Sequence, residues 1–401
     1  MEAKKCIELE DKYGAHNYLP LEVVLSRGEG IWVYDVEGKK YLDFLSSYSA
    51  LNQGHCHPKI IRSAKEQMDK LTLTSRAFYN DRLGEFLEKI VILSGMEMVL
   101  PMNSGAEAVE TALKAARKWG YTVKGVEPDK AEIIVCKNNF AGRTITIVSF
   151  TTEKQYKDGF GPYTPGFKII DYDNADALKN AISPNTVAFL VEPIQGEGGI
   201  IVPSEGYVKA TYDICKENNV LFMLDEIQTG LGRTGKMFAF EHDQGVDPDV
   251  IVMGKALSGG LYPVSCVAAK REVLEVFNPG DHGSTFGGNP LAAAIGCAAL
   301  DVLTDENLVE NSMKMGTYFL AELNKIQSKH IKDVRGRGLL IGVELHKEAG
   351  GARRFCEALQ KEGLLCKETH EHVIRFAPPL VITQKDIDWA VEKVNKILTI
   401  L

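Results

Sequence analysis

Short, uninterrupted runs of apolar residues alternate along the chain with amphipathic stretches such as GYVKATYDICKENN. Runs of this length, without polar residues at every second position, are typical of parallel strands that are buried on both faces. The five runs are AEIIVC (131–136), TVAFLVE (186–192), VLFMLDE (220–226), DVIVMGK (249–255) and VSCVAA (264–269). Strands that alternate with helices in this way predict an α/β fold with a mostly parallel central sheet flanked by helices.

Three of these runs end near a polar residue, at Glu192, Asp225 and Lys255. They recur at about the length of a βαβ unit, so the three strands should be parallel members of one sheet. The carboxyl ends of parallel strands meet at one edge, and ligands bind at that edge in such sheets. We therefore expect these three side chains to lie together in a binding site.

The two ends of the chain show different patterns. Two short β-type runs within 30–44 flank Glu37-Gly38, which predicts an antiparallel hairpin. Helical patterns from 290 to 325 are followed by a strand-like segment at 332–345 and an α/β-like tail. We therefore expect an N-terminal segment at 1–45, a large α/β domain at 46–287 and a smaller C-terminal domain at 288–401.

Composition excludes several classes of protein. The 401 residues carry a net charge of −8, which disfavours nucleic acid as a partner. No apolar run approaches the roughly 20 residues that a membrane-spanning helix needs. The first 20 residues lack the features of a secretory signal or a transit peptide. The eight cysteines are scattered singly, as is usual for reduced thiols, so we expect a cytoplasmic protein.

Some motifs resemble binding signatures but lack the required context. The sequence GLGRTGK (230–236) has the glycine spacing of both dinucleotide-binding and phosphate-binding loops. However, Met237 stands where a magnesium-binding hydroxyl is required, and DEIQT separates the motif from the preceding strand, so we expect a tight glycine turn. The pairs His55/His57 and His370/His372 lack a third ligand at a motif distance, so no metal site is expected.

Lys255 and Asp225 suggest a more specific chemistry. A lysine at the end of an apolar strand, next to a flexible SGG turn, is partly desolvated, which lowers its pKa and makes it nucleophilic toward an aldehyde. An aspartate at the end of the preceding strand can keep a pyridinium nitrogen protonated. The alternative is an ion pair that bridges two strand ends, which is the commoner arrangement for an isolated Asp and Lys.

A phosphate site is also suggested. Ser104, Gly105 and Ala106 precede a strong helical pattern, so their backbone N–H groups would meet an anion at a helix N-terminus. A plain helix cap is the alternative. Ser284 and Thr285, in DHGSTFGGNP, offer two further hydroxyls between glycines. Phe140, in NNFAGRT, is expected to stack on a cofactor ring unless it belongs to the core.

At this point the chain resembles a known family, the class III, pyridoxal-phosphate-dependent aminotransferases of fold type I. The motifs are SGAEAVETALKAARK, NNFAGRT, VEPIQGEGG, LDEIQTGLGRTGK, GKALSGG, HGSTFGGNP and RGRGLL, in this order over nearly the whole chain. The resemblance implies a smaller α+β domain built from the N-terminal segment and the C-terminal part. It also implies that Lys255 binds pyridoxal 5'-phosphate covalently, Asp225 pairs with the ring nitrogen and Gln228 hydrogen-bonds the ring hydroxyl. The phosphate ligands would be Gly105, Ala106, Ser284 and Thr285, the last two from the partner subunit of a homodimer.

Longer phrases at 13–25, 44–58, 71–80 and 374–382 are most similar to family members that act on ornithine. The implied substrates are L-ornithine, which gives up its δ-amino group, and 2-oxoglutarate. The implied carboxylate ligand for ornithine is Arg143, with Tyr18 and Tyr48 for its α-amino group. Arg375 would bind the second carboxylate of 2-oxoglutarate, and Glu197 would neutralise Arg375 while ornithine is bound.

Three other functions stay open. The protein could be a related ω-aminotransferase for N-acetylornithine, 4-aminobutyrate or lysine, and the Tyr18/Tyr48 pair is the feature that discriminates against these. It could be a nicotinamide-dependent dehydrogenase that uses the 230–235 glycines, or a non-catalytic binding protein. One departure from the family is Gly198, where related enzymes often have alanine, and we expect it to give the loop around Glu197 extra freedom.

Overall fold

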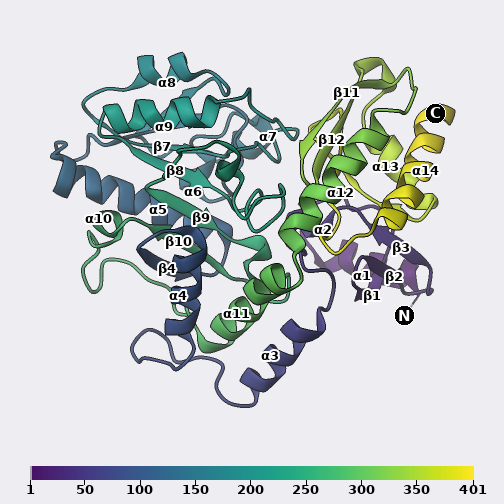
Figure 1. Cartoon of the computed structure of the whole chain (residues 1–401), viewed down its shortest axis with the longest axis horizontal. Coiled ribbons are helices and arrows are strands. Elements are labelled where there is room, and N and C mark those ends of the chain that lie inside the picture. The colour runs from purple at the N-terminus through teal and green to yellow at the C-terminus, as the bar shows by residue number, and fades with distance from the viewer. Residues whose placement is uncertain (1) are drawn as a thin grey trace.

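The computed structural model describes residues 2–401 and contains a seven-stranded sheet in one of two lobes (Figure 1). In spatial order its strands are β4 (Met98–Met102), β10 (Ser265–Ala269), β9 (Val250–Met253), β8 (Leu221–Asp225), β7 (Thr186–Val191), β5 (Glu132–Cys136) and β6 (Phe167–Ile170). The five strands from β9 to β6 are parallel, which confirms the predicted α/β class.

The direction predicted for the run at 264–269 is wrong. Strand β10 pairs antiparallel with both β9 and β4. An apolar run reports burial on both faces and carries no information about direction. The segment 254–264 between β9 and β10 contains only a short 3-10 helix (Lys255–Ser258), whereas parallel neighbours need a longer crossover, usually a helix. Strands β4 and β6 were not predicted.

Helices cover both faces of the large sheet. They are α3 (Pro58–Met68), α4 (Leu83–Ser94), α5 (Gly105–Trp119), α6 (Ile145–Val148), α7 (Lys154–Lys157), α8 (Ala175–Ala181), α9 (Tyr207–Glu217), α10 (Arg271–Leu274) and α11 (Pro290–Asp305). Successive strand residues enter different clusters: Leu221 and Met223 of β8 belong to the cluster that contains α5, whereas Phe222 and Leu224 belong to the cluster that contains α9 and α11. This alternation explains why the strands are apolar at every position.

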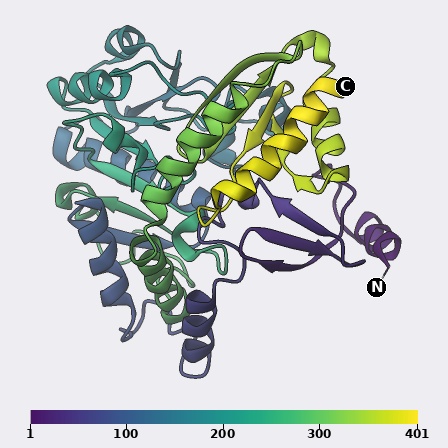
Figure 2. The same ribbon diagram turned by 45° about the vertical axis from the view of Figure 1, so that its right-hand side comes forward.

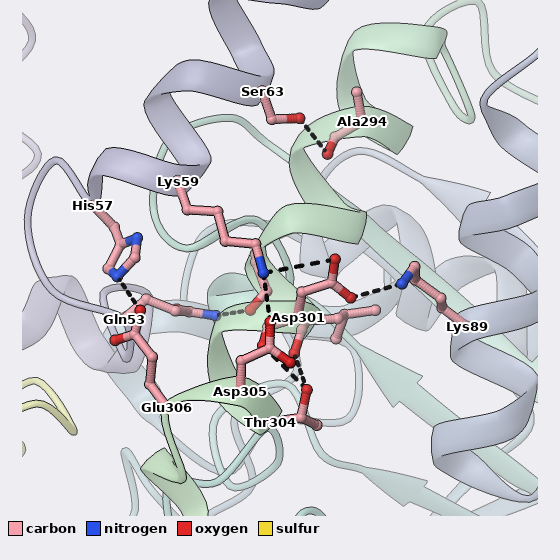
Figure 3. Close-up of polar contacts among 12 residues, drawn as sticks. Gln53, His57, Lys59, Ser63, Lys89, Ala294, Asp301, Thr304, Asp305 and Glu306 are labelled. Carbon is pink, nitrogen blue, oxygen red and sulfur yellow. Dashed lines mark hydrogen bonds and ion pairs between the residues drawn. The ribbon is translucent and has the colours of Figure 1, made fainter.

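Helix α11 is held against α3 and α4 by packing and by a row of polar contacts (Figure 3). Gly296 of α11 meets Phe86 so closely that a Cβ would lie 2.3 Å from the ring. Lys59 reaches Asp305 (2.6 Å), and Nε2 of His57 lies 3.0 Å from Glu306. These pairs lie near the surface and add little stability, so the apolar contact is the main cause of the arrangement. His57 thus has an ordinary structural partner.

The second lobe combines the two ends of the chain (Figures 1 and 2). One sheet contains β1 (Leu25–Glu29), β2 (Trp32–Asp35), β3 (Lys40–Asp43) and β13 (Leu364–Leu365), and another contains β11 (Ile331–Arg337), β12 (Leu340–Leu345), β15 (Val373–Phe376) and β14 (Lys367–Thr369). The helices are α1 (Ala3–Tyr13), α2 (Ser46–Ser49), α12 (Leu308–Leu323), α13 (Arg353–Lys361) and α14 (Gln384–Ile400). Because β13 pairs with β3, this α+β unit needs both ends of the chain. The boundaries at 45/46 and 287/288 stay predictions.

Two turns in this lobe follow from glycine. The hairpin predicted within 30–44 is confirmed, with Gly38 at φ +88° between β2 and β3. The segment 332–345 was predicted as strand-like, and it is in fact two antiparallel strands, β11 and β12, that reverse at Gly338 (φ +54°). A Cβ at Gly338 would lie 2.3 Å from the backbone of Thr234, so the reversal also needs glycine for space.

The motif at 230–236 is a tight glycine turn, as predicted. Gly232 and Gly235 have φ values of +87° and +85°. Between them the fully buried Arg233 donates hydrogen bonds to the carbonyls of Leu339 and Pro378, at 3.0 and 2.6 Å, so the turn joins the two lobes. No helix within residues 2–401 is long and apolar enough to cross a membrane.

Candidate active site

A cavity of about 200 Å³ lies at the carboxyl edge of the parallel strands. Its lining residues are Gly105, Ala106, Phe140, Ala141, Gly142, Glu192, Glu197, Asp225, Ile227, Gln228 and Lys255. Glu192, Asp225 and Lys255 follow or end strands β7, β8 and β9, so the predicted meeting of these three side chains at one edge is confirmed. The cavity also contains Ile227, which sequence reasoning did not identify.

Lys255 stands at the first position of the 3-10 helix that follows β9, with a left-handed φ of +46°. The next residue is held in place by Gln53, whose side-chain amide donates to the carbonyls of Ala256 and Ala299, each at 3.1 Å. Burial lowers the pKa of Lys255 to about 8, although the carboxylates of Glu197 and Asp225 oppose this shift. The amine is therefore far more nucleophilic at neutral pH than an exposed lysine.

Two buried carboxyl groups stand beside each other in the cavity. Burial raises the pKa of Asp225 to about 6, while the backbone N–H of Ile227 (3.1 Å) and Lys255 favour its charged form. Burial and the charge of Asp225 raise the pKa of Glu192 to about 8. The pKa of Asp225 therefore lies below that of Glu192, so Asp225 is the one of the two that more readily carries the negative charge and pairs with a cation.

Glu192 was expected at the sheet edge, but its particular contacts were not predicted. Its carboxyl oxygens accept the backbone N–H groups of Phe140 (3.1 Å) and Gly196 (3.2 Å). These residues belong to the two loops that carry the Phe140 ring and Glu197. Glu192 therefore connects two parts of the cavity wall.

Helix α5 points its N-terminus at the cavity. Gly105 and Ala106 are its first residues and line the cavity, where their N–H groups have no partner within the helix. The exposed Ser104 is the N-cap, and its hydroxyl accepts the N–H of Glu107 while Glu107 accepts the N–H of Ser104, so Ser104 forms the capping box. The helix N-terminus favours an anion beside Gly105 and Ala106.

Ser284 and Thr285 do not line this cavity within the chain. The hydroxyl of Ser284 accepts from the side-chain amide of Asn103 (2.7 Å) and from the N–H of Gly287 (3.2 Å), and Thr285 is exposed. Both therefore lie near strand β4, and the chain by itself brings only Gly105 and Ala106 of the expected phosphate ligands into the cavity.

Phe140 lines the cavity and contacts a small cluster formed by Arg143 and Tyr156. Arg143 is exposed next to the cavity, with its guanidinium carbon 3.7 Å from the ring centre of Tyr156 and 5.5 Å from that of Phe140. Tyr156, on α7, also crosses the Phe140 ring edge to face. Sequence reasoning missed Tyr156, because an isolated tyrosine in a polar segment carries no signal of its own. It holds Arg143 by cation–π contact.

Glu197, which is partly exposed, forms an ion pair with the buried Arg375 beside the cavity. Arg375 comes from β15 in the other lobe and is only 1% exposed. Although burial opposes ionisation, Arg375 and Lys255 lower the pKa of Glu197 to about 2. Two nitrogens of Arg375, Nε and Nη2, are buried without a partner in the part of the chain that the structure describes. Arg375 can thus accept a further anionic group.

Gln228 and Tyr48 complete this side of the site. The side-chain amide of Gln228 donates to Glu197 (3.2 Å) and to the backbone carbonyl of Tyr48 (3.4 Å). The Tyr48 ring lies 4.7 Å from the guanidinium carbon of Arg375. Tyr18 is exposed, yet close enough to Tyr48 to influence its pKa, which burial raises. Both tyrosines therefore lie on the Arg375 side of the site.

The loop around Glu197 is tightly held. A Cβ at Gly198 would lie 2.9 Å from the carbonyl oxygen of Asn138, so this departure from the family coincides with a close backbone approach. The hydroxyl of Thr369 donates to the carbonyl of Glu197 (2.7 Å), and Arg335 donates to the carbonyl of Gly199 (2.7 Å). These contacts do not suggest a loose loop, and the extra freedom expected from Gly198 stays a prediction.

Comparison with known proteins agrees with this site. The model of the family Aminotransferase class-III matches residues 13–398. A protein named ornithine aminotransferase from Geobacillus sp. (strain WCH70) is 63% identical, over 98% of this chain and 97% of that protein. A solved ornithine aminotransferase from Toxoplasma gondii has a TM-score of 0.97 and 45% identity, over 99% of this chain and 94% of that one. A solved acetylornithine aminotransferase from Elizabethkingia anophelis has a TM-score of 0.90 and 50% identity, over 99% of both chains. The resemblance seen in the sequence is confirmed: the chain belongs to the class III aminotransferase family.

Proposed function

We propose that this protein transfers the δ-amino group of L-ornithine to 2-oxoglutarate with pyridoxal 5'-phosphate as cofactor. The products are L-glutamate 5-semialdehyde, which cyclises to pyrroline-5-carboxylate, and L-glutamate. The observation that carries the proposal is the single cavity that combines the nucleophilic Lys255, the charged Asp225 and a helix N-terminus. The relative named ornithine aminotransferase at 63% identity, over nearly the full length of both chains, supports the substrate.

The donor groups in the cavity fit a phosphorylated pyridine aldehyde. Lys255 supplies an amine for the aldehyde carbon, and Asp225 a buried negative charge for a protonated ring nitrogen. Gly105 and Ala106 supply N–H groups for the phosphate, Gln228 a polar partner for the ring hydroxyl and Phe140 an aromatic ring. When bound, pyridoxal phosphate supplies an electron-accepting ring that takes up the electron pair of a broken C–H bond.

Three residues of the chain have separate roles in the proposed reaction. Lys255 would hold the cofactor through its amine, and the same group would carry a proton at Nζ to and from the reacting carbon. Asp225 keeps the proton of the ring nitrogen in place. Glu192 orients the loops of Phe140 and Glu197 through the two N–H groups that it accepts.

The amino donor and the amino acceptor differ in charge, yet both must bind in the same pocket. Ornithine has one carboxylate, for which we propose Arg143, and an α-amino group, for which we propose Tyr18 and Tyr48. While Arg375 is paired with Glu197, its charge is neutralised and it does not bind the carboxylate of ornithine. 2-Oxoglutarate brings a second carboxylate, which replaces Glu197 on Arg375 and meets its free Nε and Nη2 groups.

We also propose a homodimer in which Ser284 and Thr285 of each subunit reach the phosphate site of the other. The absence of both side chains from the cavity of their own chain, within residues 2–401, supports this arrangement. The eight free cysteines support a cytoplasmic location, because thiols stay reduced in that compartment.

The first test is an absorption spectrum of the purified protein before and after addition of L-ornithine, without a keto acid. We expect the visible band of the bound cofactor to disappear as the amino group is transferred, and to return when 2-oxoglutarate is added. A yellow protein that ornithine leaves unchanged would refute the substrate but keep the cofactor. A colourless protein that also fails to take up pyridoxal phosphate would contradict the enzyme proposal itself.

A second candidate substrate is N-acetylornithine, because the solved acetylornithine aminotransferase is 50% identical over the whole chain. Acetylation removes the charge of the α-amino group that Tyr18 and Tyr48 are proposed to bind. The ratio of kcat/KM for ornithine to kcat/KM for N-acetylornithine separates the two candidates. We expect ornithine to be preferred.

Substitution Tyr48→Ile tests the specificity. We expect kcat/KM for ornithine to fall about 10- to 100-fold, because a lost hydrogen bond to a charged group costs about 1.5–3 kcal/mol. Turnover of 4-aminobutyrate, which has no α-amino group, should be retained, so that simpler ω-amines compete. The measurement is kcat/KM for both donors in both proteins. An unchanged preference between them would refute the role of Tyr48.

A further inference from the structure

Four consecutive residues without glycine adopt left-handed backbone conformations in α2. The φ values of Ser46, Ser47, Tyr48 and Ser49 are +48°, +47°, +61° and +71°. L-residues visit this region singly, and a complete left-handed turn is costly because each Cβ approaches the following carbonyl oxygen. The hydroxyls of Ser46 and Ser49 are also buried without a partner among residues 2–401. Such strain persists only where surrounding contacts impose it, and it concentrates at functional sites.

The left-handed turn carries Tyr48 into the candidate site. Its backbone carbonyl accepts from Gln228 and its ring faces the guanidinium of Arg375. A turn of the opposite hand would send the side chain and the carbonyl in other directions. The strained conformation therefore determines how Tyr48 meets Gln228 and Arg375.

One carboxylate holds the beginning of the turn. Asp43, the last residue of β3 and only 7% exposed, accepts the N–H groups of Leu45 and Ser46 at Oδ1, each at 2.9 Å. Its other oxygen, Oδ2, lies 2.7 Å from Nε2 of His55. Both carboxylate oxygens of Asp43 are therefore engaged, Oδ1 by the turn and Oδ2 by His55.

His55 is itself fixed by the neighbouring strands. Its backbone exchanges two hydrogen bonds with Gly30, of 2.7 and 3.0 Å. Its ring packs on Gly28 so closely that a Cβ there would lie 2.8 Å from the ring. The imidazole thus has little freedom, and it fixes the orientation of the Asp43 carboxylate.

We propose that Asp43 and His55 are positioning residues that hold the left-handed turn and thereby orient Tyr48 for the α-amino end of ornithine. This inference rests on the proposed function. It assigns part of the substrate specificity to two residues that do not line the cavity. Substitution of Asp43 or His55 should therefore change the preference between amino donors and leave the chemistry at Lys255 unchanged.

The test compares Asp43→Ala with Asp43→Asn in the holoenzyme. Alanine removes the acceptor for Leu45 and Ser46, whereas asparagine keeps that acceptor and can bond His55 through its amide. We expect Asp43→Ala to lower the ratio of kcat/KM for ornithine over 4-aminobutyrate at least tenfold, and Asp43→Asn to restore most of it. In a Tyr48→Ile background, Asp43→Ala should change this ratio no further, because both substitutions act through Tyr48.

Asp35 offers a matched control. It also ends a strand of this sheet, and its Oδ1 accepts the N–H groups of Glu37 (2.9 Å) and Lys39 (2.8 Å), but at a turn remote from the cavity. We expect Asp35→Ala to leave the donor ratio unchanged. If Asp43→Ala does not fold, His55→Ala serves as the second variant, with a smaller loss of the ratio in the same direction.

Amide hydrogen exchange provides a readout that does not depend on activity. The amides of Leu45 and Ser46 should lose protection in Asp43→Ala and keep it in Asp43→Asn. Equal losses for both donors, full additivity with Tyr48→Ile or unchanged exchange at these amides would overturn the inference. If the unaltered protein fails to use ornithine, the proposed function fails, and the exchange experiment still decides whether Asp43 holds the turn.

Discussion

Replacing Lys255 with alanine is expected to reduce turnover by at least about a thousandfold while the protein stays folded. The substitution removes both the amine that binds the cofactor and the group that moves the proton. The fold should tolerate it, because the amine is a buried charge with a pKa already lowered to about 8 and its removal relieves that desolvation. Steady-state assays measure the turnover, the visible absorption band reports the bound cofactor, and circular dichroism shows whether the protein is folded.

Lys270 provides the matched control for Lys255. It also directly follows a buried strand, but β10 runs in the opposite direction, so Lys270 lies at the other edge of the sheet and pairs there with Asp247 (2.8 Å). Lys270→Ala should retain turnover and the cofactor band. Near-normal turnover of the Lys255→Ala protein would instead refute the role of the Lys255 amine in the reaction.

Replacing Arg375 with leucine should have two separable effects. Binding of 2-oxoglutarate should weaken by about 2–5 kcal/mol, roughly 30- to 5000-fold, because a buried partner of its carboxylate is lost. The free energy of unfolding should also fall, by about 1–3 kcal/mol, because the partly buried Glu197 loses its cation. The half-reaction with ornithine should survive better than the half-reaction with 2-oxoglutarate.

The double variant Arg375→Leu/Glu197→Leu separates these effects. It removes both charges, so the free energy of unfolding should recover while the use of 2-oxoglutarate stays impaired. The pH dependence provides a check. The pKa of Glu197 is lowered from 4.5 to about 2 in the folded protein. Its charged form therefore stabilises the fold above pH 4.5, and this contribution is lost as the pH falls toward 2. This contribution should be absent in Arg375→Leu. Equal loss of both half-reactions would argue against a specific role for Arg375.

Much of the central sheet could be read from local patterns. An apolar run at every position requires burial on both faces, and a polar residue at its end marks the sheet edge. This is why β5, β7, β8 and β9 were predicted, together with the meeting of Glu192, Asp225 and Lys255. The same pattern carries no information about strand direction, which depends on the segment that connects two strands. The parallel direction predicted for β10 was therefore wrong.

The second half of the site had no local signal. Arg375 lies on strand β15 of the second lobe, Glu197 lies in a turn after β7, and Tyr156 lies on a four-residue helix, so only a resemblance or the fold itself could bring them together. The left-handed turn at Ser46–Ser49 was equally hidden, because nothing in the residue types Ser, Ser, Tyr and Ser favours positive φ. We attribute it to Asp43, the last residue of β3, and to His55, which forms an isolated bridge with Gly30.

The sequence by itself determined the α/β class, the lowered pKa expected of Lys255, the glycine turn at 230–235 and, through its motifs, the family. These features depend on neighbours along the chain or on burial that the apolar pattern reports. The tertiary structure decided the pairing of Glu197 with Arg375, the stack of Arg143 on Tyr156 and the left-handed turn that presents Tyr48. Each of these depends on contacts between segments far apart in sequence, whose energies exist only once the lobes have packed.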